Sequence, residues 1–86
     1  MAGNEPHVVT KREKLFAKIK NKPQDVRWKE LIKFLENEGF SLRKGRGSRR
    51  IFSREDGIIF FIHEPHGSRP VDRGAMEKIL DRLEID

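Results

Sequence analysis

Six basic side chains lie within the twelve residues from Arg43 to Arg54, and no acidic residue interrupts them. The other 74 residues carry 13 basic and 14 acidic side chains, so this short run holds the chain's whole excess of positive charge. Gly45 and Gly47 allow the run to turn, and an apolar, strand-like segment follows it. Such a run is typical of a loop that grips a phosphate backbone, and it favours a protein that binds RNA.

A flexible turn with several guanidinium groups and free backbone N–H groups suits contacts to phosphates and 2′-hydroxyls, which read shape more than sequence. The alternative is a hairpin whose charged side chains are only solvated, which is the most common role of a charged run. The turn is not a nucleotide-binding P-loop, because the third glycine and the downstream Lys-Ser/Thr pair are missing. The residues predicted to bind RNA are Lys44, Arg46, Gly47, Ser48 and Arg50.

Two histidines, His63 and His66, follow the most apolar part of the chain. As metal ligands they form an incomplete site, because a structural zinc site normally closes with four ligands and the chain has no cysteine. As proton carriers they are better placed, since imidazole changes charge near neutral pH. The alternative is that His63 only ends a strand and His66 only decorates a loop. We expect no metal and no other cofactor.

The length of 86 residues predicts a single small domain with a thin core, which no disulfide stabilises. The longest apolar stretch, Ile58 to Ile62, is far shorter than the roughly 20 residues that span a bilayer, and no apolar signal region begins the chain. The sequence therefore predicts a soluble, cytoplasmic protein without a membrane association.

Three helices are expected around these residues. Thr10 and Glu13 have capping-box spacing ahead of a short helix that should stop near Lys20. A second helix carries apolar residues at the spacing of one helical face, and Gly39 suits its C-terminal cap. Asp72 offers an N-cap for a last helix that runs to about Leu83. The apolar face of the second helix comprises Trp28, Leu31, Ile32 and Leu35.

Three antiparallel strands are expected between the second and last helices, over residues 40–44, 48–54 and 58–63, with a hairpin turn at residues 55–57. The predicted fold is therefore α+β, in the order α, β, β, β, α, with an extra N-terminal helix. Alternate residues of Ile58 to Ile62 must then point away from the helices, so the second face of the sheet needs a cover. Either the N-terminal helix or a partner chain provides it.

Several segments together resemble the HicA family: a Trp-Lys-Glu-Leu-Ile-x-Phe-Leu helix, an Asn-Glu-Gly-Phe exit, a Gly-x-Gly-Ser-x-x-x-Phe hairpin and a Gly-x-x-x-x-Ile-Leu helix. The resemblance covers roughly residues 26–83. It implies a double-stranded-RNA-binding-like fold and the toxin of a toxin–antitoxin pair, an mRNA-cutting enzyme that a HicB antitoxin silences. On this basis we divide the chain into an N-terminal extension, residues 1–24, and a HicA-like domain, residues 25–86.

The resemblance also implies a catalytic histidine after Gly-Ser in the second strand, where this chain has Arg49. Arginine stays protonated and moves protons poorly, although it can clamp a phosphate and stabilise developing charge. The chain is similar to a branch of HicA-like proteins with arginine here and His-x-Pro-His after the third strand. The predicted catalytic residues are therefore Arg49, His63 and His66.

The sequence thus favours a metal-independent mRNA endoribonuclease, monomeric or in a hetero-oligomer with a HicB-like antitoxin. A noncatalytic RNA-binding module of the same fold is the alternative, because the family histidine is replaced. A third possibility is a protein-interaction domain whose basic loop docks an acidic partner.

Overall fold

The structure is a computed structural model, and it describes residues 9–85 of the chain. Residues 1–8 of the predicted N-terminal extension lie outside the described residues. The elements, in order, are α1 (Lys11–Asn21), the short 3₁₀ turn η1 (Pro23–Asp25), α2 (Trp28–Asn37), β1 (Ser41–Lys44), β2 (Arg49–Ser53), β3 (Ile59–His63) and α3 (Arg73–Arg82). The α+β fold with the order α-β-β-β-α and an extra N-terminal helix is confirmed.

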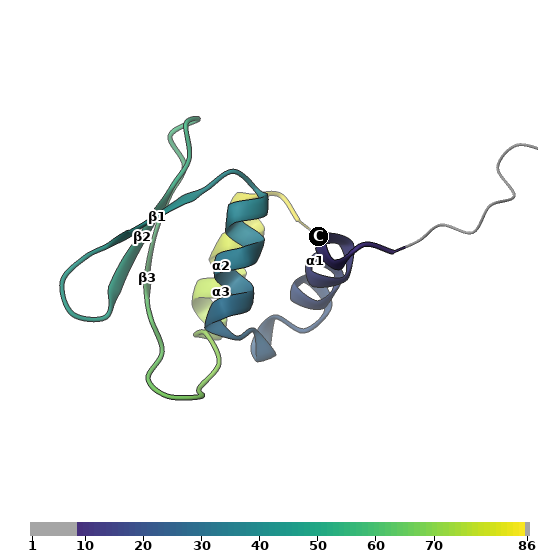
Figure 1. Ribbon diagram of the computed structural model, residues 1–86, viewed down its shortest axis with the longest axis horizontal. Helices are drawn as coiled ribbons and strands as arrows, with labels where there is room; N and C mark the ends of the chain where they lie inside the picture. The colour runs from purple at the N-terminus through teal and green to yellow at the C-terminus, as the bar shows by residue number, and fades with distance from the viewer. Residues whose placement is uncertain (1–8, 86) are drawn as a thin grey trace, which may run out of the picture.

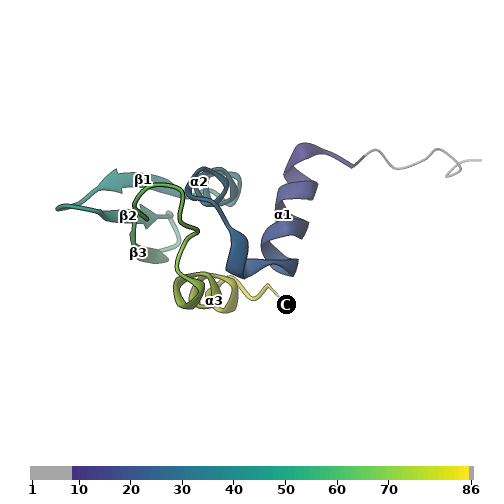
Figure 2. The same ribbon diagram turned by 90° about the horizontal axis from the view of Figure 1, so that it is seen from below.

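The three strands form one antiparallel sheet in the order β1-β2-β3, and α2 and α3 cover one of its faces. Figure 2 shows α1 on the far side of α2 and α3 from the sheet. Phe16 of α1 packs on Phe34 of α2, with ring centroids 6.1 Å apart. The alternative in which the N-terminal helix covers the second face of the sheet is therefore wrong, because α1 contacts α2 and η1 instead.

Local sequence fixes where the helices begin and end. The Thr10 hydroxyl accepts a hydrogen bond from the Glu13 N–H at 3.1 Å, and the Asp72 carboxylate accepts one from the Ala75 N–H at 3.0 Å. After α2, Gly39 adopts φ +92°, a conformation that glycine adopts without steric cost. The chain can therefore reverse into β1 within a few residues.

The core lies between the inner face of the sheet and the two covering helices. Strand alternation sends Phe52, Phe60 and Ile62 inward, where they are buried against α2 and α3. Trp28 also packs there, edge-on to Phe52 with ring centroids 5.8 Å apart. The other buried side chains of this core are Ile19, Val26, Leu31, Phe34, Leu35, Phe40, Ile58, Val71, Met76 and Ile79.

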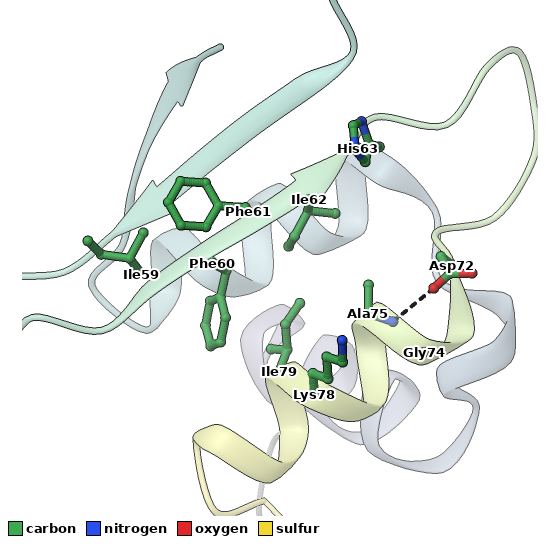
Figure 3. Close-up of a pocket in the computed structure, with 10 residues that line it drawn as sticks. All are labelled: Ile59, Phe60, Phe61, Ile62, His63, Asp72, Gly74, Ala75, Lys78 and Ile79. Carbon is green, nitrogen blue, oxygen red and sulfur yellow. Dashed lines mark hydrogen bonds between the residues drawn. The ribbon is translucent and has the colours of Figure 1, made fainter. Parts of the chain in front are cut away.

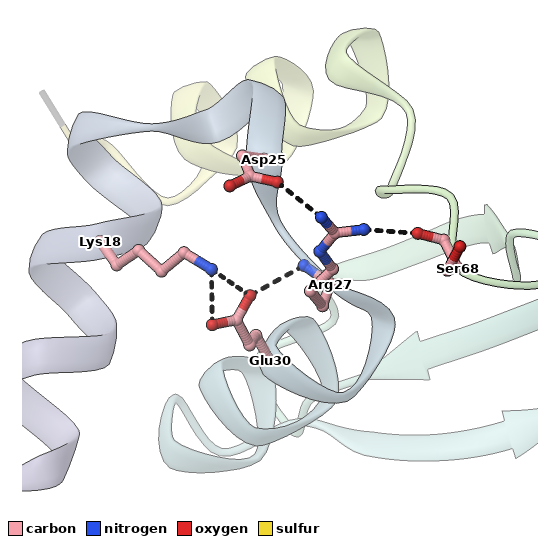
Figure 4. Close-up of polar contacts among 5 residues, drawn as sticks. All are labelled: Lys18, Asp25, Arg27, Glu30 and Ser68. Atoms are coloured by element: carbon pink, nitrogen blue, oxygen red, sulfur yellow. Dashed lines mark hydrogen bonds and ion pairs between the residues drawn. The ribbon is translucent and has the colours of Figure 1, made fainter.

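An ion pair joins α1 to α2. Lys18 Nζ donates to both carboxylate oxygens of Glu30 at 2.5 and 2.6 Å, and the Arg27 N–H donates to the same carboxylate at 2.9 Å (Figure 4). Burial, the largest single effect, raises the pKa of Glu30, but the hydrogen bonds and charges of Lys18 and Arg27 together lower it below its ordinary value of 4.5. The folded state therefore favours the ionised carboxylate.

Replacing Glu30 with glutamine should cost about 1 kcal/mol of the free energy of unfolding at neutral pH. Because the folded pKa is lowered, this contribution is present above the unfolded pKa and is lost as the pH falls through the folded pKa. Urea unfolding of both proteins from pH 7 to pH 3 measures it. The two stability curves should converge below about pH 4, and a constant difference down to pH 3 would contradict this assignment.

No helix among residues 9–85 has the length and apolar composition that crossing a membrane requires.

Candidate functional site

The turn between β1 and β2 and the segment that leaves β3 lie at the same end of the sheet (Figure 1). The strand register causes this, because Arg49 at the start of β2 is the partner of His63 at the end of β3. The Glu64 N–H also donates to the Ser48 carbonyl at 2.7 Å. Residues that are 14 and 16 positions apart in the sequence are thus neighbours.

Ser48 and His63 form a hydrogen-bonded pair at this end of the sheet. The distance from Ser48 Oγ to His63 Nδ1 is 3.1 Å. This contact uses one ring nitrogen and orients the imidazole, so Nε2 remains for another partner. His63 is exposed, whereas Ser48 is half-buried. The pair has the geometry of a proton carrier that is held by a hydroxyl.

Arg49 lies on the same face of the sheet as His63, because cross-strand partners point to the same side. Its guanidinium carbon is 4.7 Å from the centroid of the Phe61 ring. With the residues that the structure describes, it makes no side-chain hydrogen bond and no ion pair. A cation beside an imidazole, with its N–H groups unused, is suited to hold an anion.

Arg50 has a different environment, because neighbouring strand residues point to opposite faces. Its Nε donates to the Glu64 carboxylate at 3.1 Å, and its Nη1 donates to the carbonyls of Gly47 and Arg49 at 2.8 and 2.9 Å. Only 16% of its side chain is exposed. Arg50 therefore fastens the turn to the end of β3, and few of its donors remain for a ligand.

His66 reaches the same region from the loop after β3. It lines a pocket of about 320 Å³ beside the β1–β2 turn, together with Gly47, Ser48, Arg50, Glu64 and Pro65. Two contacts hold this loop against the start of α2: Arg27 Nη1 donates to the Ser68 carbonyl (Figure 4), and the Val71 N–H donates to the Val26 carbonyl at 2.8 Å. The loop thus places His66 and Ser48 in the lining of the same pocket.

Lys44 and Arg46 are the exposed cations of the β1–β2 turn. Within residues 9–85, neither side chain makes a hydrogen bond or an ion pair. Gly47 adopts φ +56°, and a side chain there would meet no atom within 4 Å, so its backbone is open to solvent. Of the predicted site residues, these three and Ser48, Arg49, Arg50, His63 and His66 all gather at one end of the sheet.

Arg54, the last residue of the basic run, does not join this cluster. It lies at the other end of β2, where it donates to Asp56 at 2.7 Å and to the Glu38 carbonyl at 2.8 Å. The hydrogen bond from Arg54, the largest effect, lowers the pKa of the Asp56 carboxyl, although burial acts in the opposite direction. The charge of Arg54 is therefore already paired.

Neither a metal site nor the groove beside α3 rivals this cluster within residues 9–85. Among residues 9–85, no three His, Asp or Glu side chains gather closely enough to hold a metal ion. A groove of about 480 Å³ runs between β3 and α3, and Figure 3 shows that its floor is apolar, with Phe60 and Ile62 pointing toward α3. Its polar groups are few, and Asp72 is engaged in capping α3. The cluster around Ser48 is therefore the stronger candidate site, because it brings together groups that can bind an anion and groups that can move a proton.

An open antiparallel sheet backed by two helices, with exposed cations and a Ser–His pair at one end, defines a small basic α+β domain of the order α-β-β-β-α. The family model for the HicA toxin of bacterial toxin–antitoxin pairs matches residues 28–85, so the chain belongs to the HicA toxin family. Membership makes it the toxin of such a pair and implies a cognate antitoxin. No curated protein and no solved structure matches the chain.

Proposed function

We propose that this toxin is an mRNA endoribonuclease that works without a metal ion, and that a HicB-like antitoxin neutralises it by covering the same end of the sheet. The observation that carries the proposal is the Ser48–His63 pair, 3.1 Å apart, next to the unpaired guanidinium of Arg49. The pair supplies a proton acceptor and the guanidinium an anion site, and RNA cleavage needs both.

The reaction is an internal transfer at phosphorus. His63 Nε2 takes the proton of the 2′-hydroxyl, and the 2′ oxygen attacks the adjacent phosphorus. The bond from phosphorus to the 5′ oxygen breaks, and the leaving oxygen takes a proton from His66. The products are a 2′,3′-cyclic phosphate and a 5′-hydroxyl, and the two histidines end with their protons exchanged.

The remaining residues position the RNA in this proposal. The Ser48 hydroxyl accepts a hydrogen bond from the Nδ1–H group of His63, which leaves the Nε2 lone pair for the substrate. Arg49 holds the phosphate that reacts and stabilises the charge that develops on it. Lys44, Arg46 and the backbone of Gly47 bind neighbouring phosphates, and Arg50 keeps the turn in place through Glu64.

A noncatalytic RNA-binding module is the second candidate. Arg49 favours it, because Arg49 stands where the resemblance implies a catalytic histidine, and an arginine does not shuttle protons. In this case the basic turn grips RNA and the antitoxin masks it, but no bond is broken.

Incubation of the protein with end-labelled, structured RNA in EDTA separates the two candidates. The endoribonuclease should give fragments with 2′,3′-cyclic phosphate ends. A shift that weakens steeply with salt, without fragments, would establish the binding module. If the RNA shows no shift and no fragments, both candidates are overturned and the protein-docking alternative remains.

A further inference from the structure

The face of the sheet that points away from α2 and α3 carries large apolar side chains. Phe61 is 58% exposed and Ile59 48% exposed, and Figure 3 shows both pointing away from α3. Ile51 is the cross-strand partner of Phe61 and shares this face. No helix among residues 9–85 covers this face, and an exposed apolar patch on a small domain usually marks a binding surface.

The charged side chains on the three strands that carry this patch are all positive. Arg43 is the neighbour of Ile51 in β1, and Arg49 lies over the ring of Phe61. The three strands contain no aspartate or glutamate. The carboxylate of Glu64, which directly follows β3, is paired with Arg50. The surface therefore complements a polyanion that also has flat, apolar faces.

Unpaired RNA has both properties and duplex RNA does not. In a duplex the faces of the bases are stacked on one another, so only phosphates and groove edges reach a protein. In a single strand each phosphate comes with a base that can stack on an aromatic ring or on a guanidinium. An acidic peptide would match the charge but would leave the stack of Arg49 on Phe61 without a role.

We propose that an unpaired nucleotide stacks against Phe61 and Arg49, with its phosphate beside His63, and that the toxin thereby selects single-stranded segments of RNA. This inference rests on the proposed function. The flat face of the Arg49 guanidinium stacks together with the base and the Phe61 ring. The N–H groups along its edge donate hydrogen bonds to the phosphate. The strand runs along the outer face of the sheet toward the Ser48–His63 pair.

Binding of 2′-O-methyl RNA, which lacks the attacking hydroxyl, tests this selection without cleavage. The probes are a single strand of about ten nucleotides, the same strand with one abasic position at each site in turn, and a blunt duplex of the same sequence. Phe61→Ala should weaken single-strand binding about 10- to 100-fold and duplex binding much less. Phe61→Tyr, which keeps the ring, should restore affinity, and Phe61→Leu should not.

One abasic position should weaken binding to the wild-type protein and cost nothing further in Phe61→Ala, because the ring and base form one contact. Circular dichroism checks that each variant is folded. Equal losses for single strand and duplex would overturn the inference. If the Phe61→Ala variant binds every RNA as tightly as the wild type, the inference is also overturned. The exposed apolar face of the sheet would then be assigned to a protein partner. A wild-type protein that binds no RNA would instead overturn the proposed function.

Discussion

Replacing His63 with alanine should lower the rate of RNA cleavage by about 10²- to 10⁴-fold, while RNA affinity stays within about a factor of three. The imidazole moves protons and makes a single contact at the phosphate, whereas the cations of the turn and Arg49 supply most of the attraction. Single-turnover cleavage of an end-labelled RNA, measured with a parallel binding titration, separates the two effects.

Two matched variants locate the effect. His66→Ala should also slow cleavage, because His66 lines the pocket beside Ser48 and is the proposed proton donor. Ser48→Ala should cost less, about tenfold, because it removes only the group that orients the His63 ring. Full cleavage by a His63→Ala/His66→Ala double variant would sink the assignment of both histidines.

The pH dependence of the cleavage rate distinguishes proton transfer by the two histidines from a purely structural role. With one histidine as base and the other as acid, the rate should first rise and then fall as the pH increases. His63→Ala should remove the rising limb and His66→Ala the falling limb. A profile with both limbs intact in each variant would show that other groups carry the protons.

The elements of this fold follow from the sequence because their signals are local. The spacing of Trp28, Leu31 and Leu35 permits only one buried helical face, and Thr10 and Asp72 cap their own helices. The predicted bounds differ from the observed ones by one or two residues, which is the usual fraying at element ends. The division at residue 24 stays a prediction.

The partners across the sheet could not be predicted in the same way. The contact between Ser48 and His63 depends on register, which the turn at Asp56 and Gly57 sets through backbone geometry. The sequence indicated only that His63 ends the third strand, not which residue of the second strand lies opposite it. Arg50, in contrast, could have been separated from Arg49 by strand alternation alone, since neighbours in a strand point to opposite faces.

Phe61 was missed as a binding residue for a related reason. Every residue from Ile58 to Ile62 is apolar, so the alternation that normally marks the solvent face is absent. The sequence showed that some of them must point away from the helices, but it did not show which. Only the burial of Phe60 and Ile62 reveals that Ile59 and Phe61 are the exposed pair.

Replacing Arg49 with alanine should lower kcat/KM for RNA cleavage by about 10²- to 10³-fold, with most of the loss in kcat. Its guanidinium lies over the Phe61 ring and opposite His63, and it makes no hydrogen bond or ion pair within residues 9–85, so it can meet the phosphate where charge develops during the reaction. Arg49→Lys should recover part of the rate, because an ammonium keeps the charge but not the bidentate geometry or the stacking face. Cleavage and binding assays of the two variants measure this.

Arg82→Ala, which removes an exposed arginine from the last turn of α3, is the control for the loss of one positive charge. It should leave kcat unchanged, since long-range attraction alone affects association. If Arg49→Ala only weakened binding and kcat stayed the same, Arg49 would bind the ground state and the transition state equally. The arginine that replaces the family histidine would then be an RNA anchor, and His63 and His66 alone would have to account for the chemistry.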